Sequence, residues 1–175
     1  EMELREEIRR YEPFNEQERE DKKEILRQME QADHILTRDN RNAHITVSAW
    51  IMDRDRKKVL MAYHNLYQSW AWLGGHADGD ADLKAVALKE IRESGLESVR
   101  FVTEDIFSLE ILTVDGHEKR GSYVPSHLHL NVTYLLEADP ELSLRIKEDE
   151  NSEIGWIGVE EIQRRSTEKW FVERI

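Results

Sequence analysis

The chain has 175 residues, with 25 Lys and Arg against 37 Asp and Glu, a formal net charge of −12 and no cysteine. This length fits one domain with a short appendage. The absence of cysteine excludes disulfides, thiolate zinc sites and thiol nucleophiles. The acidic charge argues against passive nucleic-acid binding, and no apolar run reaches the roughly 18–20 residues of a membrane span. We therefore expect a cytoplasmic protein with neither nucleic acid nor membrane as a partner.

The first 36 residues have a polar, helical pattern that Pro13 interrupts. Asn15 followed by Glu18 resembles a capping box, with Asn in the usual Ser or Thr role. Apolar residues then recur at helical spacing, at Ile25, Leu26, Met29 and Leu36. We interpret this stripe as the face that packs on the domain, with a dimer contact or a lid as alternatives. We expect an N-terminal helical extension over residues 1–42 and the main domain over 43–175.

Two predicted strands follow the extension. Residues 44–52 alternate between apolar and polar side chains, which is the period of a strand. Residues 53–58 are charged and predict a turn, and residues 59–64 read as a second strand. The pattern therefore predicts a hairpin.

A short apolar segment, residues 70–73, ends in Gly74 and Gly75. Residues 76–80 form a polar loop. The apolar spacing after this loop predicts a helix from about Ala81 to Ser94. Gly95 then stands where a helix C′ glycine belongs.

The second half of the chain is rich in strands. Residues 107–114 and 127–137 are predicted strands, and residues 115–126 between them are predicted as a long loop, of the kind that often carries function. Weaker signals predict a strand at 154–157 and helices at 159–164 and 167–173. Strands on both sides of a central helix, with helices at both ends, indicate an α/β (α+β) fold with a mixed sheet between helices.

The segment from Gly74 to Leu96, GGHADGDADLKAVALKEIRESGL, carries the chemistry. The two glycines allow a tight turn and a close approach to a ligand. Glu90 and Glu93 are spaced i,i+3 and share one face of the predicted helix. Such a pair is usually a solvated face, but two carboxylates are costly to bury unpaired, and a hard cation such as Mg²⁺ removes that cost.

This segment resembles the signature of the Nudix hydrolase family, G-x5-E-x7-R-E-U-x-E-E-x-G-U, in which U is a bulky apolar residue. The matching positions are Gly75, Lys89 in place of Arg, Glu90, Ile91, Glu93, Gly95 and Leu96. The phrases SWAWLGGHADGD and SHLHLNVTYLLEA are similar to those of one bacterial subgroup of the family. The resemblance covers about residues 43–165.

The segment also departs from the signature. Ala81 stands at the first Glu position, and Lys89 cannot form the bidentate fork of the signature Arg. One residue is missing between Glu90 and Gly95. Glu93 keeps a ligand position whichever end anchors the alignment, whereas Glu90 keeps it only from the N-terminal side. We expect weaker metal binding as a result, unless the sequence simply omits one glutamate.

The resemblance implies an Mg²⁺- or Mn²⁺-dependent pyrophosphohydrolase that acts on a diphosphate linkage in a small nucleoside-diphosphate-type substrate. It implies that Glu90 and Glu93 hold the metal and that a carboxylate from a later loop, for which we favour Glu150 over Asp149 and Glu153, completes the catalytic set. By analogy with the family, a homodimer is a further expectation.

We assign substrate binding to residues around the signature and on the later strands. They are Trp70, Gly74, Gly75, His76, Asp78, Lys119, Arg120, His127 and His129. His127 and His129 share one face of a strand. A histidine cluster there is able to bind a transition metal or to donate hydrogen bonds to phosphate, although any single His is more often a satisfied polar side chain. Four aromatic residues are candidates for stacking on a base or for the core: Trp50, Trp70, Trp72 and Tyr123.

Two other functions compete with hydrolysis. The shortened signature is compatible with a Nudix-like domain that binds a nucleotide without turning it over. An isopentenyl-diphosphate-isomerase-like enzyme ranks last, because that chemistry, by resemblance, relies on a cysteine and this chain has none.

Overall fold

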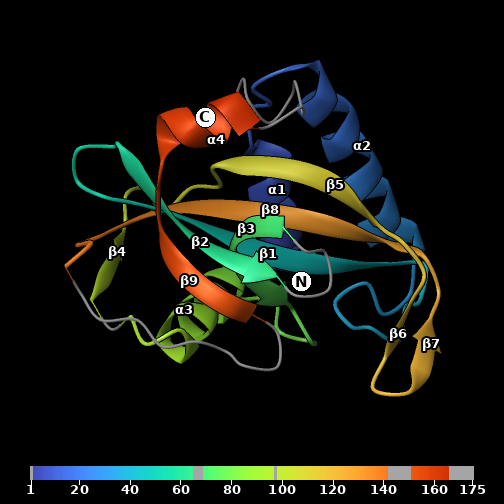
Figure 1. Ribbon diagram of the computed structural model, residues 1–175. Helices are drawn as coiled ribbons and strands as arrows, with labels where there is room; N and C mark the ends of the chain where they lie inside the picture. Colours follow the sequence, from blue (N-terminus) through green and yellow to red (C-terminus); the bar gives the residue numbers. More distant parts are fainter. Residues whose placement is uncertain (1, 65–68, 97, 142–150, 166–175) are drawn as a thin grey trace. The chain divides into compact units, whose positions relative to one another are not determined.

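The computed structural model describes residues 2–64, 69–96, 98–141 and 151–165 (Figure 1). The helices are α1 (Met2–Arg10), α2 (Glu16–Gln31), α3 (Leu83–Glu93) and α4 (Val159–Arg165). The strands are β1 (Ala43–Met52), β2 (Lys58–His64), β3 (Ser69–His76), β4 (Val99–Phe101), β5 (Ser108–Val114), β6 (His117–Lys119), β7 (Ser122–Val124), β8 (His127–Ala138) and β9 (Asn151–Gly158).

The chain divides into two compact units. The first comprises residues 1–47, 75–86 and 105–133, and the second comprises residues 48–74, 87–104 and 134–175. Strands β1, β3 and β8 and helix α3 each have residues in both units. Within the described residues, seven strands form one sheet with the order β4-β8-β1-β3-β2-β9, in which β5 also pairs with β8.

In the first unit, β5 pairs antiparallel with β8 from Ser108↔Thr133 to Val114↔His127. Helix α1 packs on α2, and α2 packs along β5 (Figure 1). Apolar side chains from these elements and from β1 are buried, among them Ile8, Ile25, Met29, Ile45, Leu109, Leu130 and Val132. The predicted stripe on α2 therefore faces the core, as Ile25 and Met29 show.

Polar side chains of α2 bind the backbone of β5. Glu18 Oε2 accepts a hydrogen bond from Leu109 N at 3.1 Å, and Asp21 Oδ2 accepts one from Ile111 N at 3.0 Å. Gln17 Nε2 donates to Leu109 O at 3.3 Å. Because the free edge of a strand is a template for unwanted pairing, these contacts protect β5.

In the second unit, β2 lies between two neighbours. It pairs antiparallel with β3, with Met61 opposite Trp72, and with β9, with Met61 opposite Gly155. Met52 at the end of β1 pairs with Val59, which confirms the predicted hairpin. Trp50 is 5% exposed and meets the Trp72 ring edge-on with centroids 5.6 Å apart, so Trp50 is a core residue.

The predicted α+β class with a mixed sheet is confirmed. The predicted loop over residues 115–126 is wrong, because it contains the β6–β7 hairpin. Its turn places Arg120 at φ 50° and Gly121 at φ 81°, the positive values that short hairpin turns require. Strand β4 was not predicted. The predicted helix at 167–173 lies outside the described residues, and the domain boundary at residue 42 stays a prediction.

Candidate functional site

Helix α3 carries the signature and has well-defined ends. Asp82 Oδ1 accepts a hydrogen bond from Ala85 N at 3.2 Å, which caps the first turn. At the other end, Gly95 has φ +96° and its N donates to Arg92 O at 2.9 Å. The predicted C′ role of Gly95 is thereby confirmed, since only glycine adopts this conformation without strain.

The two signature glutamates lie near the C-terminal end of α3. The side chain of Glu93 is exposed and that of Glu90 is partly buried. Ser94, which stands at the second Glu position in one alignment, is 1% exposed and its Oγ donates to Ile91 O. The residue in that position therefore closes the helix and offers no carboxylate. The metal-binding roles of Glu90 and Glu93 stay predictions.

The glycine pair does not form the turn that the sequence predicts. Gly74 and Gly75 lie within β3, and the chain turns later, where Asp78 has φ 48° and Gly79 has φ 92°. Asp78 is held there by Arg38, with Nε to Oδ1 at 3.0 Å and Nη2 to Oδ2 at 2.9 Å. This ion pair fixes the loop that precedes α3.

The remaining predicted residues are distributed over several elements. Lys119 and Arg120 are exposed on the β6–β7 hairpin, and Tyr123 beside them is 66% exposed. The backbone of Trp70 lies in β3, but its side chain is outside the described structure, as is the whole of Glu150. The structure therefore does not test the proposed roles of Trp70 and Glu150.

Four histidines of the first unit come together from three strands. His44 lies on β1, His76 ends β3, and His127 and His129 lie on β8. The His44 ring centroid is 5.3 Å from that of His76, 4.8 Å from that of His127 and 5.1 Å from that of His129. The ligand atoms of His44, His127 and His129 lie within 4.8 Å of one another. His44 was not among the predicted site residues.

Burial keeps most of these rings neutral at pH 7. Burial lowers the pKa of His44. Burial, followed by the positive charge of Arg38, lowers the pKa of His76 to about 4. Burial, followed by the neighbouring histidines, lowers the pKa of His129 to about 3. Neutral imidazole is the form that offers a nitrogen lone pair to a ligand.

A second polar cluster of the first unit is held by Glu110 on β5. Its Oε1 accepts hydrogen bonds from Asn131 Nδ2 and from Thr133 Oγ1, and its Oε2 accepts one from Ser108 Oγ at 3.1 Å. Thr46 Oγ1 extends the network by donating to Asn131 Oδ1 at 2.8 Å. Burial raises the pKa of Glu110, although the hydrogen bonds that it accepts act in the opposite direction.

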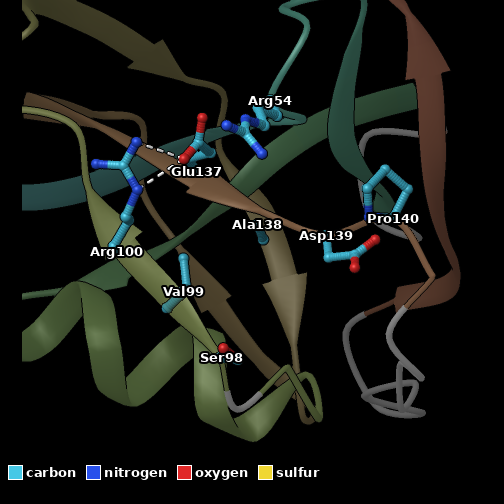
Figure 2. A pocket seen from close by; sticks show the side chains of 8 residues that line it. All are labelled: Arg54, Ser98, Val99, Arg100, Glu137, Ala138, Asp139 and Pro140. Atoms are coloured by element: carbon cyan, nitrogen blue, oxygen red, sulfur yellow. Dashed lines mark hydrogen bonds and ion pairs between the residues drawn. The ribbon is translucent and has the colours of Figure 1, made fainter.

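A pocket of the second unit contains none of the predicted site residues (Figure 2). Its lining residues are Arg54, Ser98, Val99, Arg100, Glu137, Ala138, Asp139 and Pro140. Glu137 is held there by Arg100, with Nε to Oε2 at 2.7 Å, and by Arg56, with Nη1 to Oε1 at 3.0 Å. Because its carboxylate is already paired with two guanidinium groups, we assign it a structural role.

Several solved structures are similar to this chain in fold. The chain resembles the MutT protein from Methanosarcina mazei Go1, with a TM-score of 0.53, 18% identity, and coverage of 77% of this chain and 91% of that one. It is also similar to a NUDIX-family hydrolase from Clostridium perfringens, with a TM-score of 0.47, 20% identity, and coverage of 76% and 96%. A C. elegans Ap4A hydrolase matches with a TM-score of 0.48, 16% identity, and coverage of 74% and 91%.

Neither a protein-family model nor a curated protein sequence matches the chain. The fold is that of the Nudix hydrolases. The resemblance of the Gly74–Leu96 segment to that family is therefore confirmed as far as the fold is concerned. Among the described residues, no helix is long and apolar enough to cross a membrane.

Proposed function

We propose that the protein hydrolyses a diphosphate linkage in a small nucleoside-diphosphate-type molecule with the help of Mg²⁺ or Mn²⁺. The observation that carries the proposal is the position of Glu90 and Glu93, three residues apart on α3, in a chain with the Nudix fold. In this proposal residues 43–175 form the Nudix domain and residues 1–42 form its helical extension.

The donor set on α3 fits the proposed metal. Carboxylate oxygens are the ligands that Mg²⁺ prefers, and Mn²⁺ accepts the same donors. Glu93 is exposed and Glu90 is only partly buried, so a hydrated ion has access to both. When bound, such an ion polarises phosphate oxygens and lowers the pKa of a coordinated water. Glu150 is the proposed further carboxylate.

On the substrate side, the exposed cations Lys119 and Arg120 of the β6–β7 hairpin suit phosphate oxygens. The substrate-binding role of Asp78 stays a prediction, and its contacts give it a structural role as well. Because Arg38 holds both of its carboxylate oxygens, Asp78 supports the loop before α3.

A nucleotide-binding domain without turnover is the second candidate. The observation that favours it is Ser94, which is buried and bonded to the end of α3 where one alignment of the signature has its second paired Glu. One carboxylate fewer reduces the negative charge available to a divalent ion and weakens its binding.

A product-release assay tests the proposal. The protein is incubated with Mg²⁺ or Mn²⁺ and a panel of nucleoside triphosphates, dinucleotide polyphosphates and sugar nucleotides. We expect release of phosphate or a nucleoside monophosphate that needs the metal and is abolished in Glu93→Gln. Glu30→Gln, which neutralises an exposed carboxylate on α2, is the matched control and retains full activity.

The two candidate functions give different results in this assay. Calorimetric binding of a panel member without any product supports the binding domain. Neither turnover nor binding across the panel refutes both candidates. Turnover that survives in Glu93→Gln removes Glu93 from the site.

A further inference from the structure

We propose that His44, His127 and His129 bind one transition-metal ion, for which Zn²⁺ is the best fit, through ring nitrogens that converge from β1 and β8. The ligand atoms of these three residues lie within 4.8 Å of one another. The site lies entirely in the first unit of the chain. It uses nitrogen donors and does not depend on the proposed hydrolysis or on the glutamates of α3.

The nitrogen spacing fits a zinc ion. His127 Nε2 and His129 Nε2 are 3.2 Å apart. Zinc–imidazole bonds of about 2.0–2.1 Å in a tetrahedral arrangement separate neighbouring ligand nitrogens by about 3.3 Å. The pair on β8 therefore already has the separation of two ligands on one ion. Residues i and i+2 of a strand share a face, so both rings lie on the same side of β8.

In two of the rings, the Nδ1 atom already has a hydrogen-bond partner. His44 Nδ1 lies 3.0 Å from Asn40 O, and His127 Nδ1 lies 2.9 Å from Pro125 O. A carbonyl oxygen only accepts, so each Nδ1 carries a hydrogen, and Nε2 is the nitrogen left to bind a metal. Histidines that bind metals characteristically donate their second nitrogen to a carbonyl in this way.

His44 decides between a metal site and an ordinary hydrogen-bonded cluster. A hydrogen bond between the two Nε2 atoms satisfies His127 and His129 without any metal. It leaves His44 Nε2, which is buried and has no hydrogen-bond partner, in a residue that is only 4% exposed. A buried polar atom without a partner is unfavourable. A metal ion bound by all three rings removes that cost.

The type of donor selects the type of ion. Imidazole nitrogen suits Zn²⁺, Cu²⁺, Ni²⁺ and Fe²⁺, whereas Mg²⁺ prefers oxygen. Three histidines that leave a fourth position open form a site in which zinc keeps a water or an anion. His76 lies next to the three rings, edge-on to His129 at a centroid distance of 5.1 Å.

The full chain, freed of metal with EDTA and dialysed, is titrated with Zn²⁺ by calorimetry and with Co²⁺ by visible absorption. We expect the chain to bind one Zn²⁺. Bound Co²⁺ should give the visible absorption bands of an ion held by few ligands, most of them nitrogen. Millimolar Mg²⁺ should not compete with either ion. His44→Ala and His127→Ala each weaken Zn²⁺ binding by roughly a hundredfold, because each removes one of three ligands. His34→Asn is the matched control, since His34 is exposed and has φ 56°, which Asn tolerates.

Two further measurements make the outcome decisive. Zn²⁺ raises the melting temperature of the unmodified chain and EDTA reverses the rise, which tests the site even if a variant fails to fold. Glu93→Gln, which removes the proposed Mg²⁺ ligand, retains Zn²⁺ binding, so failure of the hydrolase proposal leaves this one standing. The inference is overturned if the unmodified chain binds no Zn²⁺, or if a folded His44→Ala/His127→Ala double variant binds it unchanged.

Discussion

Glu18 is the residue whose removal should most weaken the contact between α2 and β5. It is 2% exposed, and its carboxylate accepts hydrogen bonds from Phe14 N at 2.7 Å and from Leu109 N at 3.1 Å. The Tyr11 hydroxyl also lies 2.7 Å from Glu18 Oε1. Glu18→Ala removes the acceptor of all three groups at once.

The size of the effect follows from these contacts. A buried donor that loses its only partner costs about 1–3 kcal/mol. Tyr11 Oη remains 2.9 Å from Phe107 O, so its hydroxyl keeps an acceptor and adds little. The buried N–H of Leu109 then sets a loss of about 1–3 kcal/mol, and that of Phe14 adds less because Phe14 is 51% exposed and water reaches it. This is a large share of the roughly 5–15 kcal/mol that holds a typical domain together.

Urea unfolding followed by circular dichroism measures the loss as a lower midpoint at an unchanged slope. Glu18→Gln keeps an acceptor oxygen and should lose clearly less than Glu18→Ala. Asp21→Ala is the matched comparison, because Asp21 accepts from one backbone group of β5, Ile111 N, and is only partly buried. A Glu18→Ala loss below about 1 kcal/mol, or one equal to that of Asp21→Ala, refutes the reasoning.

Three other predictions concern the network on β5 and the signature helix. The pKa of Glu110 is raised in the folded state, so its contribution to stability is present below its ordinary pKa and disappears as pH rises through the folded value. Glu110→Gln cannot ionise, and urea unfolding at a series of pH values should show its stability rising relative to wild type across that window. Gly95→Ala should cost about 1 kcal/mol, because the φ of +96° at Gly95 suits only glycine, and thermal unfolding checks it. A glutamate inserted between Glu93 and Ser94 restores the signature spacing and should tighten Mg²⁺ binding measured by calorimetry; unchanged affinity contradicts the proposed metal role of this helix end.

The sequence predicted elements whose pattern is local. The alternation over residues 44–52 and 127–137 and the apolar stripe of α3 each extend over two or more turns or pleats, so they identified β1, β8 and the helix. The β6–β7 hairpin was missed because each strand has three residues, too few to show alternation. Its Arg120-Gly121 turn was the available signal.

The sequence could not predict contacts that join distant elements. Asn15 caps α2 as expected, accepting from Glu18 N at 2.9 Å. The side chain of Glu18 also bonds to Phe14 N and to Leu109 N of β5, and the local pattern does not predict the contact with β5. The N–H groups along the edge of β5 come within reach of α2 only in the folded chain, so local patterns do not reveal such contacts.

The same limit explains the histidines. The i,i+2 spacing of His127 and His129 predicted that they share one face, but no local pattern links them to His44, which begins the predicted strand over residues 44–52. It is more than eighty residues from them in the sequence, and pairing across the sheet brings the rings together. One feature did mark His44: it is the second residue of β1, and all the residues of that strand are buried.

The two proposals thus give the chain two sets of ligands of different chemical character, oxygen donors on α3 and nitrogen donors on β1 and β8. Zn²⁺ binds most nitrogen and oxygen sites more tightly than Mn²⁺ does, so excess zinc competes for the glutamates as well. A stoichiometric amount should fill the histidines first, because imidazole is the better zinc ligand. Activity with Mg²⁺ must therefore be compared between EDTA-treated protein and protein loaded with one equivalent of zinc. A difference between these two preparations that disappears in His44→Ala would link the two ligand sets, whereas equal activity would make them independent.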